Sequence, residues 1–241
     1  MNSYSVEINN LSKRYENILA VKNLNFKIKK SQIIGLLGPN GCGKSTTIGM
    51  LLGLVKPTSG SVLINNKNIE NSRTSILEKM NFISPYIELP KKLTIEENLE
   101  VYGRMYGVKN LKNKIIELMS KLHLTDFKKR KTGELSSGQK NRVSLAKALI
   151  NDPEILLLDE PTASLDPDVG DYVRNFIQEF ASTKGTTILL ASHNMSEVER
   201  LCDEVMMMKK GEIIDKGKSV DLINKHGRKN LEEVFLKIAR E

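Results

Sequence analysis

The stretch from Gly38 to Thr46 constrains this chain more than any other. It reads Gly-Pro-Asn-Gly-Cys-Gly-Lys-Ser-Thr and matches the phosphate-loop pattern, in which four residues separate a glycine from Gly-Lys-Ser. An apolar run at 33–37 precedes it and a helix-forming run at 46–54 follows. A strand, a glycine turn and a helix are therefore predicted in succession. That context favours a nucleoside triphosphate site over a glycine-rich turn without a ligand.

The chemistry of a phosphate explains the residue types of this loop. Its glycines permit backbone conformations in which successive N–H groups face one anion at a helix N-terminus. Lys44 would reach the β- and γ-phosphates, and the Ser45 hydroxyl would be a Mg²⁺ ligand. The predicted nucleotide-binding residues of the loop are Gly38, Pro39, Asn40, Gly41, Cys42, Gly43, Lys44, Ser45 and Thr46.

Two further apolar strands are predicted to end in polar side chains. The run 155–158 ends in Asp159 and Glu160, and the run 186–191 leads to His193. Such strands belong to parallel sheets, whose ligands gather beyond the carboxyl ends of the strands. Asp159 is then the expected Mg²⁺ partner of Ser45 and Glu160 the base for the attacking water, with a solvated loop as the alternative. His193 is expected to contact the γ-phosphate, although a buried core histidine is the more ordinary interpretation.

Composition bounds the class of protein. With 241 residues, 39% of them hydrophobic, the chain can bury a sizeable core, and its apolar runs are far shorter than the roughly 20 residues that span a bilayer. The formal net charge is +8, and the densest basic run is 128–131. A solvated basic surface explains this better than nucleic-acid binding. Two distant cysteines, Cys42 and Cys202, and no leader segment favour a reduced, cytoplasmic setting.

The order of predicted elements divides the chain. A nucleotide-binding α/β core is expected at 1–93 and 153–217, an inserted helical subdomain at 94–152 and a helical tail at 218–241. Thr94 to Glu97 is a predicted capping box, Asp166 with Pro167 should start a helix, and Ser196 to Glu199 should cap the next one. The segments 204–208 and 212–216 are predicted to form a hairpin. Tyr15 is expected in a polar loop, where it could stack on an adenine ring or pack on the sheet rim.

A fifth motif, Leu135-Ser-Ser-Gly-Gln139, makes the pattern specific. With the phosphate loop, Asp159-Glu160, Ser164-Leu165-Asp166 and His193, in this order and at these separations, the chain resembles the ATP-binding cassette (ABC) ATPases over about residues 4–217. The resemblance implies an α/β fold: a P-loop NTPase core with a mostly parallel sheet, an N-terminal antiparallel β portion and an inserted α-helical subdomain. It also implies ATP and Mg²⁺ as cofactors.

The resemblance further implies a dimer. In the family, each ATP lies between one phosphate loop and the partner's signature turn, so Ser137, Gly138 and Gln139 would contact the γ-phosphate bound by the other subunit. Tyr15 matches the adenine-stacking aromatic residue and Asp166 the residue at the dimer interface. One set of motifs in 241 residues implies a dimer with itself or with a similar cassette.

One position departs from the family pattern. Where the family usually has a glutamine that serves Mg²⁺ and the attacking water, this chain has Pro85, which lacks a side-chain amide and stiffens the loop. Hydrolysis or its coupling to transport is therefore expected to work differently here.

The resemblance implies the ATPase subunit of an ABC transporter, peripheral on the cytoplasmic face of the membrane and bound to a separate transmembrane permease. The tail Leu231-Glu-Glu-Val-Phe-Leu236 resembles that of cassettes serving ABC-2 type exporters, which favours export. Two alternatives remain at this point: a soluble cassette protein of translation or DNA repair, and a weakly hydrolysing nucleotide-gated regulator.

Overall fold

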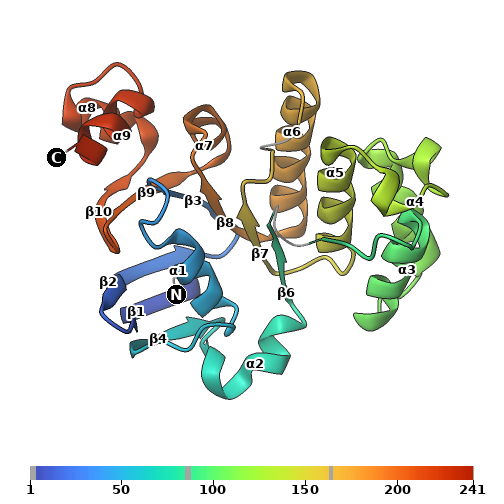
Figure 1. The fold of residues 1–241 in the computed structure, drawn as a ribbon, viewed down its shortest axis with the longest axis horizontal. Coiled ribbons are helices and arrows are strands. Elements are labelled where there is room, and N and C mark those ends of the chain that lie inside the picture. The colour runs from blue at the N-terminus through green and yellow to red at the C-terminus, as the bar shows by residue number, and fades with distance from the viewer. Residues whose placement is uncertain (1–3, 85–87, 163–164, 241) are drawn as a thin grey trace. The chain divides into compact units, whose positions relative to one another are not determined.

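The computed structural model describes residues 4–84, 88–162 and 165–240, and it separates into two compact units (Figure 1). The phosphate-loop unit consists of residues 1–77 and 187–241, and the signature unit of residues 78–186. Pro85 and Ser164 lie outside the described residues. We describe each unit by itself.

The phosphate-loop unit contains an antiparallel sheet and a mainly parallel group of strands. The antiparallel sheet has the order β2-β1-β4-β5. In the second group β3 is parallel to both β8 and β9, and β10 closes a hairpin with β9 as predicted. Every residue of β3 and β8 is buried, which is why these strands read as unbroken apolar runs. The strands are β1 (Tyr4–Tyr15), β2 (Ile18–Lys29), β3 (Ile33–Leu37), β4 (Ser59–Ile64), β5 (Lys67–Asn68), β8 (Thr187–Ser192), β9 (Glu204–Lys209) and β10 (Glu212–Gly217).

The helices of this unit include a docked C-terminal helix. It begins after Asn230, within the predicted tail 218–241, and Leu231, Val234 and Ile238 form its buried stripe. Both of its ends are held by side chains from elsewhere, because Glu199 accepts the N–H of Leu231 at 2.9 Å and Lys209 donates to the Ile238 carbonyl oxygen at 2.7 Å. The helices are α1 (Lys44–Leu51), α2 (Ile69–Leu77), α7 (Met195–Leu201), α8 (Ser219–His226) and α9 (Leu231–Arg240).

In its described residues, the signature unit joins two parallel strands to four α-helices. The predicted capping box of α3 is present, since Thr94 and Glu97 each accept the other's backbone N–H. Asp166 is the N-cap residue of α6 and Pro167 its first residue, also as predicted. The elements are β6 (Met80–Ile83), α3 (Ile95–Met105), α4 (Leu111–Lys121), the 3₁₀ turns η1 (Thr125–Phe127) and η2 (Thr132–Glu134), α5 (Ser137–Ala148), β7 (Ile155–Asp159) and α6 (Pro167–Lys184).

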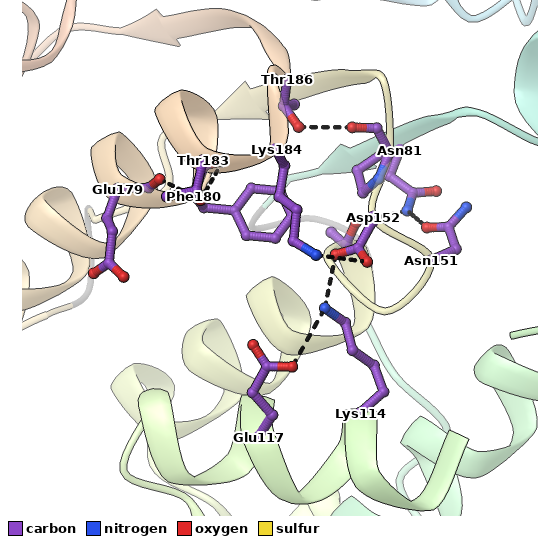
Figure 2. A network of polar contacts seen from close by, with 12 residues as sticks. Asn81, Lys114, Glu117, Asn151, Asp152, Glu179, Phe180, Thr183, Lys184 and Thr186 are labelled. Carbon is purple, nitrogen blue, oxygen red and sulfur yellow. Dashed lines mark hydrogen bonds and ion pairs between the residues drawn. The ribbon is translucent and has the colours of Figure 1, made fainter. Parts of the chain in front are cut away.

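A carboxylate fixes α4 within this unit (Figure 2). Asp152, just before β7, accepts from the ammonium groups of Lys114 on α4 at 2.7 Å and Lys184 on α6 at 3.1 Å. Burial pushes the pKa of Asp152 upward, but hydrogen bonds from the two lysines outweigh it and hold that pKa below its usual value. The predicted subdomain 94–152 is thus bonded through its last residue to α6, and its boundary stays a prediction. None of the helices in the described residues is long and apolar enough to cross a membrane.

Candidate active site

The phosphate loop joins β3 to α1, and its glycines have conformations that require glycine. Gly41 has φ 78° and Gly43 φ 111°, both in the region that other residues avoid. A Cβ atom on Gly43 would also lie 2.6 Å from the carbonyl oxygen of Ala20 on β2. The turn between β9 and β10 braces the loop, because the Gly211 N–H donates to the Cys42 carbonyl oxygen at 2.9 Å. The loop conformation is therefore set by the surrounding backbone.

The start of α1 is arranged to receive an anion. Gly43 is its N-cap, and within the described residues no side chain caps the helix and no acidic residue occupies its first turn. The first N–H groups are thus available to a phosphate. Lys44 is only 8% exposed, and its ammonium group donates to the carbonyl oxygens of Gly38 at 2.5 Å and Pro39 at 3.3 Å. The ammonium group is therefore held within the loop, where it can leave these carbonyl oxygens and bind a phosphate instead.

The remaining side chains of the loop divide by exposure. Ser45 is exposed at the start of α1, where its hydroxyl is accessible, and Thr46 is half-buried. Cys42 is buried, and burial raises the pKa of its thiol despite the opposing charge of Lys44. Burial likewise raises the pKa of Cys202. Both thiols stay protonated at neutral pH, in agreement with a structural part for the cysteines.

Tyr15 lies at the end of a strand, which corrects the expectation of a polar loop. It is the last residue of β1 and pairs with Ile18 across the turn. Its ring is 44% exposed, and the Lys13 ammonium lies 4.9 Å from the ring centroid. Ala20, the backbone neighbour of Gly43, is two residues beyond Ile18. Tyr15 is thus an exposed aromatic residue carried by the hairpin that packs against the phosphate loop.

His193 follows β8, which is hydrogen-bonded to the strand that leads into the phosphate loop. In the parallel ladder Leu37 of β3 pairs with Ser192 of β8. Gly38 and His193 are the next residues on the two strands, so the predicted edge contains both. The His193 side chain is exposed.

The predicted metal ligand Asp159 and the predicted base Glu160 lie in the signature unit. Asp159 ends β7, is 8% exposed and accepts a hydrogen bond from the Ser84 hydroxyl at 3.4 Å. Glu160 has φ 52°, an uncommon conformation that is often found at functional positions. Ser84 was not predicted as a site residue. Its place directly after β6, which runs parallel to β7, is the signal that could have identified it.

The signature turn forms the start of α5 and has a complete side-chain cap. Ser136 accepts the N–H of Gln139 at 3.2 Å, and the Gln139 side chain accepts the N–H of Ser136 at 3.0 Å. Ser137 is exposed and Gly138 half-buried. A small pocket of about 150 Å³ lies beside the turn. Its polar lining includes Ser84, Glu88, Lys91, Thr132, Ser137, Lys140, Asn141 and Ser144.

The predicted metal ligands suit Mg²⁺ by their chemistry. A serine hydroxyl and a carboxylate are hard oxygen donors, which Mg²⁺ prefers. Within the described residues no three His, Cys, Asp or Glu side chains cluster to hold a metal ion alone. Mg²⁺ in proteins usually retains several water molecules and binds substrate phosphates. Ser45 and Asp159 belong to different units, and their pairing stays a prediction.

Comparison with known proteins gives a consistent result. A family model described as ABC transporter matches residues 21–163, more than half of the chain. The bacitracin transport ATP-binding protein BcrA of Bacillus licheniformis is 37% identical over 232 residues, covering 94% of this chain and 74% of that protein. The linearmycin resistance ATP-binding protein LnrL of Bacillus subtilis is 36% identical over 224 residues, covering 92% of this chain and 72% of that protein.

Solved structures agree with the sequence relatives. An ATP-binding subunit of an ABC transporter superimposes with a TM-score of 0.89 at 26% identity, covering 96% of this chain and 98% of that one. The ATP-binding cassette MJ0796, in a dimeric post-hydrolysis state with ADP and phosphate, gives 0.81 at 29% identity, covering 88% and 98%. The P-loop NTPase fold expected from the sequence is confirmed. With the phosphate loop, the strand-end carboxylates and the signature helix, these similarities show that the chain belongs to the ABC transporter family of ATP-binding proteins.

Proposed function

We propose that this protein is the ATP-binding and ATP-hydrolysing subunit of an ABC transporter that powers export through a separate transmembrane permease. The observation that carries the proposal is the start of α1. It has glycine-dependent backbone geometry, uncapped N–H groups and a lysine held by the carbonyl oxygens of its own loop. In a member of the ABC family, this arrangement supports ATP as the ligand.

In this proposal, each site residue has its own role in the hydrolysis of ATP to ADP and phosphate. Backbone N–H groups of the loop and Lys44 bind the β- and γ-phosphates, and the exposed Tyr15 ring stacks on the adenine. Glu160 orients the attacking water and accepts its proton, while His193 contacts the γ-phosphate. Ser45 and Asp159 would hold Mg²⁺, which offsets the charge that develops on the phosphate oxygens.

We propose that two copies complete each other's sites. The N–H groups of Ser137 and Gly138 lie at a helix start without an acidic first turn, so they suit the γ-phosphate of an ATP bound by a second copy. The dimeric MJ0796 cassette supports this arrangement. In such a dimer Asp166, exposed before α6, would lie at the interface.

The names of the relatives support transport. One is named for bacitracin transport and another for linearmycin resistance. Nod factor export ATP-binding proteins of several bacteria are 33–36% identical to this chain. These names favour the transporter subunit over a soluble factor of translation or DNA repair. We place the protein on the cytoplasmic face of the membrane, held there by the permease.

The test is the variant Glu160→Gln. Because only the base is removed, the variant should bind ATP with Mg²⁺ as well as the wild type does, while turnover falls about 100-fold or more. A variant that hydrolyses ATP at the wild-type rate would contradict the assignment of Glu160. Loss of ATP binding would show that Glu160 supports the fold of the site.

A further inference from the structure

A buried carboxylate on α7 is not used by the proposed mechanism. Glu197 is 1% exposed, and its Oε2 atom accepts a hydrogen bond from the Ser192 hydroxyl at 2.7 Å. Removing a carboxylate from water is costly, and an apolar side chain would fill such a position without that cost. Glu197 is therefore a buried charge that the fold keeps at a cost in free energy.

The Ser192 hydroxyl connects this carboxylate to the backbone on the far side of His193. Ser192 is fully buried, and its Oγ atom also accepts the backbone N–H of Asn194 at 3.1 Å. A hydroxyl has a single proton, so donating it to Glu197 turns the oxygen lone pairs toward the N–H of Asn194. The residues before and after His193 are thus joined by a hydrogen-bonded bridge that includes Glu197.

The same segment is fixed at the start of α7. Asn194 caps the helix by accepting the N–H of Glu197 at 3.2 Å, and the ladder with β3 holds Ser192 opposite Leu37, the residue before the phosphate loop. The backbone of His193 is therefore held between a strand and a helix cap. Its exposed side chain is carried by a segment that has little freedom to move.

We infer that Glu197 is a positioning residue: through the Ser192 hydroxyl it fixes the backbone of His193 beside the strand that leads into the phosphate loop. The inference rests on the proposed contact between His193 and the γ-phosphate. As a positioning residue, Glu197 contacts neither the nucleotide nor the attacking water, and its effect on hydrolysis is exerted through His193.

The test compares kcat and KM for ATP among purified variants. Glu197→Ala should lower kcat about tenfold or more and change KM less than about threefold, because the phosphate loop is untouched. Glu197→Gln should retain at least about half of kcat, since its amide oxygen can accept from Ser192. The matched control is Glu199→Ala, two residues along the same helix, which loses the bond to Leu231 of α9 and should keep the wild-type kcat.

The decisive comparison is a double-mutant cycle. If Glu197 acts through His193, the double variant His193→Ala/Glu197→Ala should turn over no more slowly than His193→Ala alone. Multiplicative losses, or a Glu197→Ala variant with wild-type kcat, would overturn the inference. If Glu197→Ala does not fold, Ser192→Ala carries the test, with the same tenfold loss expected and a wild-type kcat contradicting it.

The outcomes separate this inference from the proposed function. Wild-type turnover in His193→Ala would refute the proposed part of His193 and the inference together. A stalled His193→Ala beside an unaffected Glu197→Ala would refute the inference alone.

Discussion

Two helix starts of this chain are proposed to face the same phosphate group, and they are built in opposite ways. The start of α1 has a glycine N-cap in a left-handed conformation and, among the described residues, no side-chain cap. The start of α5 has a reciprocal cap between Ser136 and Gln139. Both lack acidic residues in the first turn, so both favour anions.

This difference in capping indicates that the helix starts of α1 and α5 respond differently to substitution. The α1 loop depends on its backbone and on Lys44, and the N–H groups at its helix start, which no side chain of the described residues caps, suit a bound phosphate. The α5 turn satisfies part of its own backbone and keeps its shape alone. The first site should therefore be sensitive to any change of the loop, whereas loss of the cap at the second should cost mainly stability and slow turnover only several-fold.

The largest effect is expected from Lys44→Ala. The variant loses the buried ammonium group of the loop, so ATPase activity should fall at least about 100-fold and ATP affinity should fall with it. Lys30→Ala, in an exposed turn, is the control and should match the wild type. Near-normal turnover in Lys44→Ala would contradict the phosphate-loop assignment.

The next effect should come from Gly43→Ala. The substitution combines a φ of 111° with a Cβ placed 2.6 Å from the Ala20 carbonyl oxygen, and it should cost about 2–4 kcal/mol of unfolding free energy and weaken ATP binding. Gly107→Ala is the matched control: its φ is 63° but nothing lies within 4 Å, so only about 1 kcal/mol is expected and ATP binding is unchanged. Equal losses in thermal denaturation would show that backbone angle alone matters.

A smaller effect is expected from Ser136→Ala. Loss of the cap should lower the unfolding free energy by about 1 kcal/mol, as should Thr94→Ala in the equivalent box of α3. Only Ser136→Ala should also slow ATPase turnover several-fold, because it loosens the N–H groups of Ser137 and Gly138. Equal ATPase rates in the two variants would count against a part for the α5 start in catalysis.

The smallest effect is expected from Asp152→Asn at neutral pH. The unfolding free energy of the variant should be lower by only about 1 kcal/mol, because Asp152 is partly exposed and solvent screens its ion pairs. The pKa of Asp152 is lowered in the folded protein, so its contribution is complete above about pH 4 and disappears as pH falls through that lowered pKa. Denaturant unfolding at several pH values should show the wild type and variant converging in acid, whereas the exposed Asp126→Asn should differ little from the wild type at any pH.

The sequence predicted elements whose signals are local and strong. The buried strands at β3, β7 and β8, the Thr94 cap and the Asp166-Pro167 helix start are all confirmed. Apolar runs and capping residues act within a few positions, so they can be read without knowledge of the fold.

The elements and residues that were predicted wrongly or not at all lie where two local sequence signals compete or where no local signal exists. Helix α7 is capped by Asn194 and not by Ser196, because two capping residues stand two positions apart and the Ser196 hydroxyl donates to Asn194 instead. The strand position of Tyr15 was not predicted, because the turn after it, Glu16 and Asn17, lacks the glycine that usually marks a hairpin. Helix α2 is polar and kinked at Ser72, so it has little apolar periodicity. Ser84 was missed although it directly follows β6, because its bond to Asp159 depends on which strand lies beside β6. Glu197 could not be predicted, because its bond to Ser192 depends on burial.

The central claim, that α1 of one copy and α5 of another form one site, is tested most directly by mixing two inactive variants. Lys44→Ala destroys the first half of each site and Ser137→Arg the second, so each variant alone should be inactive. In an equal mixture that exchanges subunits freely, half of the dimers are mixed and each retains one intact site, so about a quarter of the wild-type ATPase activity should return. Activity in the mixture no greater than the mean of the two variants measured alone would contradict the shared site.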